Sequence, residues 1–346
     1  PSAHAITLMG DKIAARKTVD AVDVPVVPGT ENPVADRAEA EALLKDIGLP
    51  VLLKAKAGGG GRGMRIVRRA EDVGSEFDDA SREAAGAFGD GSLYMERYLE
   101  RVRHVEIQVL ADTHGNTLSL GERDCSIQRR HQKLIEEGPS PAVDAALRQK
   151  MGETAVKAAR SVDYVGAGTV EFLLDPANGE FYFIEMNTRI QVEHPVTEML
   201  TGIDLVAAQI KIASGEELPY AQADIVPVGH AIECRINAED PALDFTPAPG
   251  LIETYRAPGG PGVRVDSQCY QGYRVPPEFD SLLAKVIVHA PDRPGALRRM
   301  RRALGEFVIE GLPTTIPFHL EMLDDPGFAA GDVTTDYLQR RNMAAG

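Results

Sequence analysis

The sequence contains no apolar tract of the length needed to cross a membrane, and it contains few cysteines. A membrane-spanning helix needs about 20 consecutive apolar residues, and no segment approaches that length. No charged and then apolar leader opens the chain, so we expect a soluble protein. The three cysteines, Cys125, Cys234 and Cys269, are widely separated and odd in number, which argues against a disulfide framework. A reducing cytoplasm is therefore the expected location.

Positive charge is also in short supply. The 37 lysines and arginines face 52 aspartates and glutamates, and the formal net charge is -15 at pH 7. Such a surface repels nucleic acid and anionic membranes, so neither is expected as a general partner. None of the eight histidines forms an HxxxH or HExxH pair, which leaves a zinc site with little support. Any local basic cluster is informative, because it departs from the overall charge.

The 346 residues are enough for two or three domains. A helical pattern over residues 2–22 ends at a stretch rich in proline and glycine, which predicts a boundary near residue 25. Later segments alternate between the 3.6-residue period of a helix and the two-residue period of a strand. Helices are predicted at 35–47, 71–88 and 294–306, strands at 49–57, 64–68 and 92–99, hairpin turns at 113–116 and 175–179, and one further helix from Pro195 to about Gly215.

Polar residues occupy every second position from residue 185 to residue 193. They are Glu185, Asn187, Arg189, Gln191 and Glu193. Because a strand sends successive side chains to opposite faces, this spacing predicts one row of polar groups. Simple solvent exposure is the better interpretation for a single carboxylate on a strand. For this row, with bulky apolar residues between its members, the pattern favours the floor of an active site.

The second predicted hairpin adds a carboxylate to this row. With a five-residue loop, Glu171 lies opposite Phe183, so that Glu171 and Glu185 become diagonal neighbours about 7 to 8 Å apart. Two carboxylates and the amide of Asn187 suit a magnesium ion that also binds substrate phosphates. We therefore expect a divalent cation here.

Residues 58–61 are four consecutive glycines between two predicted strands. A flexible hairpin is the simplest interpretation, and neither a Walker nor a dinucleotide motif is present. Backbone amides without side chains can close on phosphate oxygens, however, and Lys54 and Arg62 stand beside them. We interpret the segment as a lid over a triphosphate.

The segment 123–133 is rich in basic residues. A solvated loop is the usual meaning of such a run. Placed after a strand, it can instead neutralise phosphate or bicarbonate, with Lys133 as a point charge. His131 and His104, each taken alone, are more often structural.

Taken together, these motifs resemble biotin carboxylase, an ATP-grasp enzyme. The resemblance lies in MGDK at 9–12, KAKAGGGGRGM at 54–64, RHVEIQVLAD at 103–112, RDCSIQRRHQK at 123–133, EMNTRIQVEHPVTE at 185–198 and HAIECRINAEDP at 230–241. It covers essentially the whole chain. It implies an α+β ATP-grasp fold, with a small glycine-loop lid domain and a larger antiparallel-sheet C-terminal domain. The implied division is a helical linker at 1–24 that follows a missing N-terminal domain, a lid at 25–98, and a large subdomain with the C-terminal region at 99–346.

The resemblance also implies roles for individual residues. Contacts to ATP are implied for Lys12, Lys54, Gly58, Gly59, Gly60, Gly61, Met64, Glu96, Leu99, His104, Gln128, His131 and Leu173. Mg²⁺ or Mn²⁺ would be held by Glu171 and Glu185, with Asn187 assisting.

The remaining implied roles concern bicarbonate and biotin. Arg189, Gln191 and Val192 would form the bicarbonate site, and His131 and Lys133 would lie near it and the terminal phosphate. Glu193 would be the base that deprotonates bicarbonate. Arg235 would stabilise the biotin enolate.

The implied reaction is the ATP-dependent carboxylation of biotin through carboxyphosphate. Implied partners are bicarbonate, a biotinylated carrier domain and a carboxyltransferase component, with a homo-oligomer as the assembly. Residues 258–267, PGGPGVRVDS, favour the biotin carboxylase region of an acyl-CoA carboxylase α chain. Two alternatives stay open: a nucleotide-binding fragment that is catalytically incomplete, and another ATP-grasp ligase that joins an acid to an amine.

Overall fold

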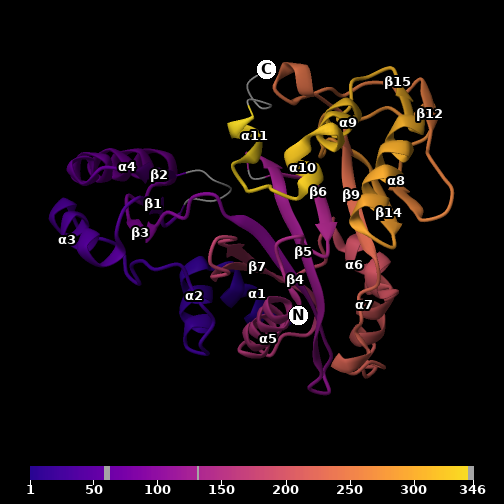
Figure 1. The fold of residues 1–346 in the computed structure, drawn as a ribbon. Helices are drawn as coiled ribbons and strands as arrows, with labels where there is room; N and C mark the ends of the chain where they lie inside the picture. The colour runs from indigo at the N-terminus through magenta and orange to yellow at the C-terminus, as the bar shows by residue number, and fades with distance from the viewer. Residues whose placement is uncertain (58–62, 131, 342–346) are drawn as a thin grey trace.

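One large antiparallel sheet runs through the centre of the molecule, in a computed structural model that describes residues 1–57, 63–130 and 132–341 (Figure 1). Its strand order is β13-β14-β9-β6-β5-β4-β7-β8. The strands are β4 Arg103–Ala111, β5 Thr117–Arg129, β6 Gln132–Gly138, β7 Gly166–Leu174, β8 Phe181–Asn187, β9 His230–Asn237, β13 Val263–Ser267 and β14 Leu282–Ala290.

One face of this sheet is apolar, because the side chains of each strand alternate and the inward set is aliphatic. Val105 and Ile107 of β4 pack with α1, α2 and α5, while Ile232 and Ile236 of β9 pack with α8 and α9. These helices are α1 Ala3–Gly10, α2 Lys12–Asp20, α5 Ala145–Arg160, α8 Arg293–Glu306 and α9 Ile316–Asp324.

The opposite face carries a polar band across several strands. Glu171 of β7 lies opposite Glu106 of β4, and Glu106 lies opposite Arg123 of β5. Further along the sheet, Glu136 of β6 lies opposite Glu233 of β9. Two helices, α6 His194–Thr201 and α7 Leu205–Ala213, pack on apolar parts of the same face. We call this side of the sheet the polar face.

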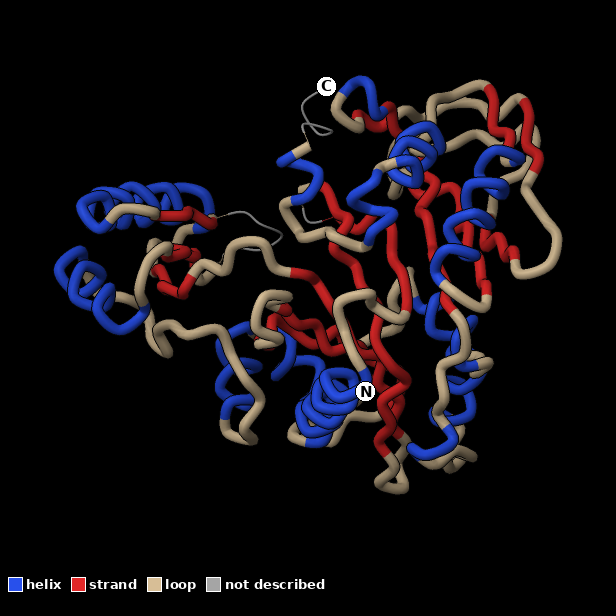
Figure 2. The backbone as a smooth tube through the Cα atoms, in the orientation of Figure 1, coloured by secondary structure: helices blue, strands red, loops and turns tan. Residues whose placement is uncertain are grey.

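A second, smaller sheet with strand order β2-β1-β3 forms a lobe with α3 and α4, at the left of Figures 1 and 2. Its core contains Leu53, Phe77 and Met95. The elements of this lobe are α3 Arg37–Ile47, β1 Val51–Ala55, β2 Met64–Val67, η1 Ala70–Asp72, α4 Val73–Phe88 and β3 Leu93–Arg97.

Short elements complete the chain. Two small antiparallel pairs are formed by β10 with β11 and by β12 with β15. The bounds are η2 Gln222–Asp224, β10 Glu239–Asp240, η3 Pro241–Leu243, β11 Thr246–Pro247, β12 Thr254–Arg256, β15 Val308–Glu310, α10 Pro326–Ala330 and α11 Tyr337–Arg340. No helix in the described part of the chain is both long and apolar enough to cross a membrane.

Three local expectations need correction. The hairpin register shifts between Glu171 and Phe172, so Glu171 lies directly opposite Glu185 and not opposite Phe183. Strand β8 ends at Asn187, so the predicted polar row leaves the strand after its second member. The helix expected from Pro195 to about Gly215 is two helices, because Gly202 ends α6 in the left-handed conformation (φ 73°). The domain division at residues 24 and 98 stays a prediction.

Phe172 on the apolar face offers a test of this arrangement. It is fully buried on β7 and stacks edge-on against Phe181 of β8, with ring centroids 5.3 Å apart. We expect Phe172→Ala to lower the free energy of unfolding by about 3–5 kcal/mol in urea titrations, because it leaves a cavity. The matched control is Phe279→Ala, whose side chain is 79% exposed, with an expected change of about 0.5 kcal/mol or less. Equal losses for both variants would contradict the core assignment.

Candidate active site

A cavity of about 1150 Å³ lies between the small lobe and the polar face of the large sheet. All the described candidate residues line it: Lys12, Lys54, Met64, Glu96, Leu99, His104, Gln128, Lys133, Glu171, Leu173, Glu185, Asn187, Arg189, Gln191, Val192, Glu193 and Arg235. Gly58 to Gly61 and His131 lie outside the described residues. The side chains selected from the sequence therefore meet in one cavity, although several come from other elements than expected.

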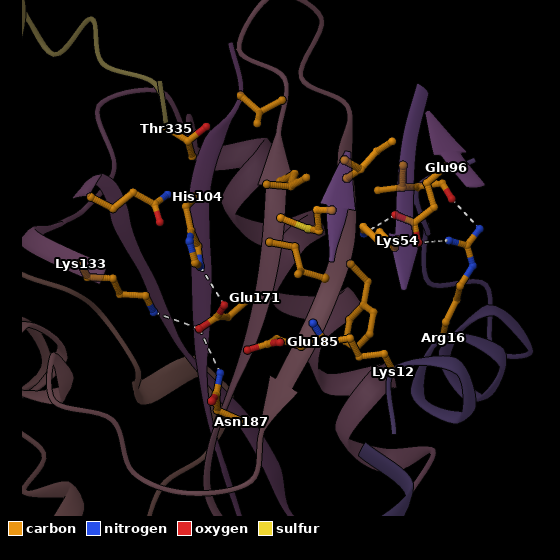
Figure 3. A pocket seen from close by; sticks show the side chains of 18 of the residues that line it. Lys12, Arg16, Lys54, Glu96, His104, Lys133, Glu171, Glu185, Asn187 and Thr335 are labelled. Atoms are coloured by element: carbon orange, nitrogen blue, oxygen red, sulfur yellow. Dashed lines mark hydrogen bonds and ion pairs between the residues drawn. The ribbon is translucent and has the colours of Figure 1, made fainter. Parts of the chain in front are cut away.

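Glu171 is the centre of one wall of this cavity (Figure 3). One of its oxygens, Oε1, accepts hydrogen bonds from Lys133, Asn187 and Gln191, each at 2.9 Å. The other, Oε2, lies 2.9 Å from Nε2 of His104. Burial opposes ionisation, but His104 and then Lys133 outweigh it and hold the pKa of Glu171 well below its usual range. The partner histidine responds in the opposite sense, since Glu171 raises the pKa of His104 against the effect of burial.

Lys133 of β6 joins three carboxylates. Its Nζ donates to Glu106 at 2.5 Å, to Glu171 at 2.9 Å and to Glu193 at 2.6 Å. Although burial disfavours a charged amine, the carboxylates, led by Glu106, raise the pKa of Lys133 above its ordinary value. The ammonium group is therefore permanently charged.

Glu193 lies between two cations at the start of α6. Its Oε1 accepts from Lys133, and its Oε2 accepts from Nη2 of Arg235 at 3.0 Å. Burial alone would favour the protonated form, yet Lys133, Arg235 and Arg123 lower the pKa of Glu193 to about 2. The side chain is a fully ionised carboxylate in this arrangement.

Arg235 is itself held from several sides. Its Nε donates to Oε1 of Glu136 at 2.6 Å. Its backbone oxygen accepts from the hydroxyl of Thr315 at 2.8 Å and lies 2.7 Å from Nε2 of His319. These contacts hold the backbone of Arg235 against the start of α9 and hold its guanidinium between Glu136 and Glu193.

Arg123 is a residue that the sequence interpretation did not assign. It is fully buried on the polar face and donates to Glu106 at 2.7 Å, Gln108 at 2.8 Å, Thr197 at 2.8 Å and Gln191 at 3.2 Å. It therefore ties β4 to α6 and to the loop that carries Gln191. The alternation within its own strand gave no signal for it, because its partners lie on segments distant in sequence.

At the other wall, Glu96 stands between Lys54 and Arg16 (Figure 3). Lys54 Nζ donates to Oε2 of Glu96, and Arg16 Nη1 donates to Oε1 at 3.2 Å. Arg16 also donates to the backbone oxygen of Val27 at 2.5 Å. A role for Arg16 in this cavity was not predicted. It is one charged residue in the helical pattern of residues 2–22, and nothing in that pattern distinguishes it from a solvent-exposed arginine.

The loop after β8 carries the last three members of the polar row, Arg189, Gln191 and Glu193, along the cavity. Gln191 and Glu193 are buried, whereas Arg189 is exposed and its Nη1 donates to the backbone oxygen of Ile190 at 3.2 Å. The alternation from 185 to 193 thus arises from a strand followed by a loop. Both parts line the cavity because the loop continues along its floor.

The residues predicted to bind a metal fit a hard divalent cation. Glu185 lies directly opposite Glu171 in the sheet, and Figure 3 shows both carboxyl groups with Asn187 beside the same space. Glu185 forms no ion pair among the described residues, so its charge is free for an ion. Carboxylate and amide oxygens are the ligands that Mg²⁺ prefers, together with phosphate oxygens.

Comparisons with known proteins identify the family. Residues 11–221 match the family described as "Carbamoyl-phosphate synthase L chain, ATP binding domain", and residues 233–340 match "Biotin carboxylase C-terminal domain". The chain is 58% identical to a biotin carboxylase of Nostoc sp., over 99% of this chain and 76% of that protein. It is 54% identical to a pyruvate carboxylase subunit from Methanothermobacter thermautotrophicus, over 100% of this chain and 70% of that protein.

A solved structure agrees with these matches. The biotin carboxylase domain dimer of Hydrogenobacter thermophilus 2-oxoglutarate carboxylase, in complex with MgADP, ADP and bicarbonate, superposes with a TM-score of 0.90 at 50% identity. The match covers 98% of this chain and 75% of that one. The chain therefore belongs to the biotin carboxylase family of ATP-dependent ligases and has its ATP-grasp fold.

Proposed function

We propose that this chain carboxylates biotin on a carrier protein, using ATP and bicarbonate, and that Glu193 is the base of the reaction. The observation that carries the proposal is the position of Glu193, with one oxygen on Lys133 and the other on Arg235. Bicarbonate is a small anion that the same two cations attract. A carboxylate between them is in the right place to take its proton.

In the first step, Glu193 deprotonates bicarbonate, whose oxygen attacks the terminal phosphorus of ATP. ADP leaves and carboxyphosphate forms. Lys133 and His104 place positive charge beside the transferring group, where it offsets the negative charge of the transition state. Lys12 and Lys54 hold phosphates at the other wall, after Lys54 leaves Glu96.

The pKa of Glu193 connects substrate binding to this step. A carboxylate with a pKa of about 2 is a weak base. If bicarbonate takes the hydrogen bonds of Lys133 and Arg235, the groups that depress this pKa turn to the substrate, and the basicity of Glu193 rises. The base is thus activated where and when its substrate is present.

In the second step, carboxyphosphate breaks down to carbon dioxide and phosphate. Phosphate takes the ureido proton of biotin, and the biotin nitrogen captures the carbon dioxide. Arg235 would stabilise the enolate oxygen of biotin, because its guanidinium stays charged at any working pH. Arg189, Gln191 and Val192 complete the bicarbonate pocket in this proposal.

Glu171, Glu185 and Asn187 would hold Mg²⁺ or Mn²⁺, which supplies positive charge to the terminal phosphates when bound. The nucleotide would occupy the rest of the cavity, against Met64, Glu96, Leu99, Gln128 and Leu173. Contacts of Gly58 to Gly61 and of His131 with ATP stay predictions.

A biotinylated carrier and a carboxyltransferase component would complete the reaction, and the dimer of the Hydrogenobacter relative supports a homo-oligomer. An acyl-CoA carboxylase α chain is still the predicted parent, and the Methanothermobacter relative, which belongs to a pyruvate carboxylase, supports pyruvate as the competing acceptor.

Cys125, Cys234 and Cys269 are free thiols, which supports a reducing cytoplasm.

The direct test is ATP hydrolysis with Mg²⁺ and bicarbonate, with and without free biotin. Stimulation by biotin is expected, because carboxyphosphate breakdown is drawn forward when carbon dioxide is captured. ATP binding without any biotin-dependent hydrolysis would favour the alternative of a catalytically incomplete fragment.

Glu193→Gln tests the base. We expect the rate of bicarbonate-dependent ATP cleavage to fall at least about 100-fold, because the amide cannot accept the proton. The dissociation constant for ATP, from calorimetry, should change less than about threefold, since Glu193 contacts no phosphate in the proposed arrangement. Glu321→Gln on the exposed side of α9 is the control. A large loss of nucleotide affinity in the Glu193 variant would rule out this role.

Glu185→Gln tests the metal site. Removing one charged ligand should raise the Mg²⁺ concentration needed for half-maximal ATP binding about tenfold or more, because magnesium depends on carboxylate charge. The control is Glu180→Gln, an exposed carboxylate before the same strand. If both variants show the Mg²⁺ dependence of the parent chain, Glu185 is not a ligand.

A further inference from the structure

Glu233 is a buried carboxylate that the proposed reaction does not use. It stands two residues before Arg235 on β9, on the polar face of the sheet, and its exposed fraction is 0%. Neither of its side-chain oxygens has a hydrogen-bond partner in the part of the chain that the structure describes. An ionised carboxylate in that environment is costly, because it has lost water and gained no donor.

The residue directly opposite Glu233 is another carboxylate. Glu136 of β6 pairs with it in the sheet register and is also 0% exposed. One oxygen of Glu136 accepts from Nε of Arg235 at 2.6 Å, but Oε2 has no partner among the described residues. Side chains directly opposite on antiparallel strands have Cβ atoms about 4.5–5.5 Å apart, so the two carboxyl groups start from neighbouring positions on the polar face.

The surrounding cations are engaged elsewhere. Lys285 of β14 donates to the backbone oxygen of Val192 at 2.9 Å and lies 3.6 Å from Asp266. Arg235 is divided between Glu136 and Glu193. No cation in the described chain forms an ion pair with Glu233.

The ionisable residues of the helix that packs here, α6, have other partners as well. Nδ1 of His194 lies 2.7 Å from the backbone oxygen of Gln191, and Glu198 accepts from Arg264 at 2.7 Å. The group that can satisfy the orphaned oxygens is therefore a proton shared between the two acids.

A shared proton would give the unpartnered oxygens a hydrogen bond and would also remove the repulsion between two buried charges. A protonated Glu233 donates to Oε2 of Glu136, and Glu136 keeps one negative charge for Arg235. Two ionised carboxylates would instead repel in this buried position. In agreement, burial raises the pKa of Glu136 to about 7, and burial followed by Glu136 raises the pKa of Glu233 well above its usual value.

We infer that Glu136 and Glu233 hold one proton between them in the folded protein, and that this acid pair positions Arg235 against Glu193. With the proton present, Glu136 offers Arg235 a single charge, and the guanidinium also reaches Glu193. With both acids ionised, the doubled charge would draw Arg235 toward the sheet. The catalytic part of this inference rests on the proposed function, whereas the shared proton rests on the buried pair alone.

The proton is tested by the pH dependence of stability, with Glu233→Gln as the variant. In the unfolded chain the carboxyl has a pKa of about 4.3, so above that pH the parent chain must take up a proton on folding. The folded-state pKa is raised, and the parent chain therefore loses stability as pH rises. The isosteric amide removes that loss. Between pH 5.5 and 6.5, the unfolding constant of the parent chain should rise relative to that of the variant by about tenfold per pH unit.

The control is Glu321→Gln, an exposed acid for which that ratio should stay constant with pH. A constant ratio for Glu233→Gln as well would overturn the shared proton. The measurement needs no catalytic activity, so it remains decisive if the proposed carboxylation fails.

Positioning is tested by kinetics of the Gln and Leu variants at position 233. The amide of Glu233→Gln still donates to Glu136, so its rate of biotin-dependent ATP cleavage should stay within about threefold of the parent. Glu233→Leu keeps the volume but offers no donor, and we expect at least a tenfold loss in kcat with an unchanged KM for ATP. Full activity of the Leu variant, once its folding is verified by circular dichroism, would refute the positioning role.

Discussion

The site depends on the contacts between the ammonium group of Lys133 and three buried carboxylates. The ammonium group lies within hydrogen-bond distance of Glu106 on β4, Glu171 on β7 and Glu193 before α6. Three carboxylates that close to one another, and this deeply buried, would repel strongly without a cation at their centre. The lysine therefore does more than neutralise charge. It joins β4, β7 and the segment before α6 into one arrangement, and the loss of any partner would leave a buried charge without compensation.

The sheet makes this concentration of charge possible because it separates two environments. Alternation along β4 directs Val105 and Ile107 toward the helices and Glu106 toward the polar face. The helix-covered face supplies the burial that stabilises the fold, so the polar face does not need to. Buried ion pairs are weak sources of stability but precise constraints on geometry, and Arg123, with partners on β4 and α6, shows the pattern most fully. Function and stability are thus assigned to opposite sides of the same strands.

The sequence predicted which residues line the cavity better than it predicted the strand and loop that carry them. Alternation in residues 185–193 selected residues that do line one cavity, although only Glu185 and Asn187 lie on the strand. The register error at Glu171 arose because a bulge cannot be read from loop length. Arg123 and Glu136 were missed for a different reason. Their importance comes from cross-strand pairing between segments distant in sequence, which periodicity within one segment does not reveal.

The same charge pattern bears on how the proposed base would respond to its substrates. In the structure, Glu193 is held by Lys133 and Arg235, and Lys54 is held by Glu96, so the groups proposed to act on bicarbonate and ATP begin in pairs with each other. Such pairs keep buried charges compensated before the substrates arrive. Anionic substrates can then exchange for the internal carboxylates without creating an uncompensated cation. In the proposed reaction, this exchange would free Glu193 as a stronger base only once bicarbonate has taken over its two cations.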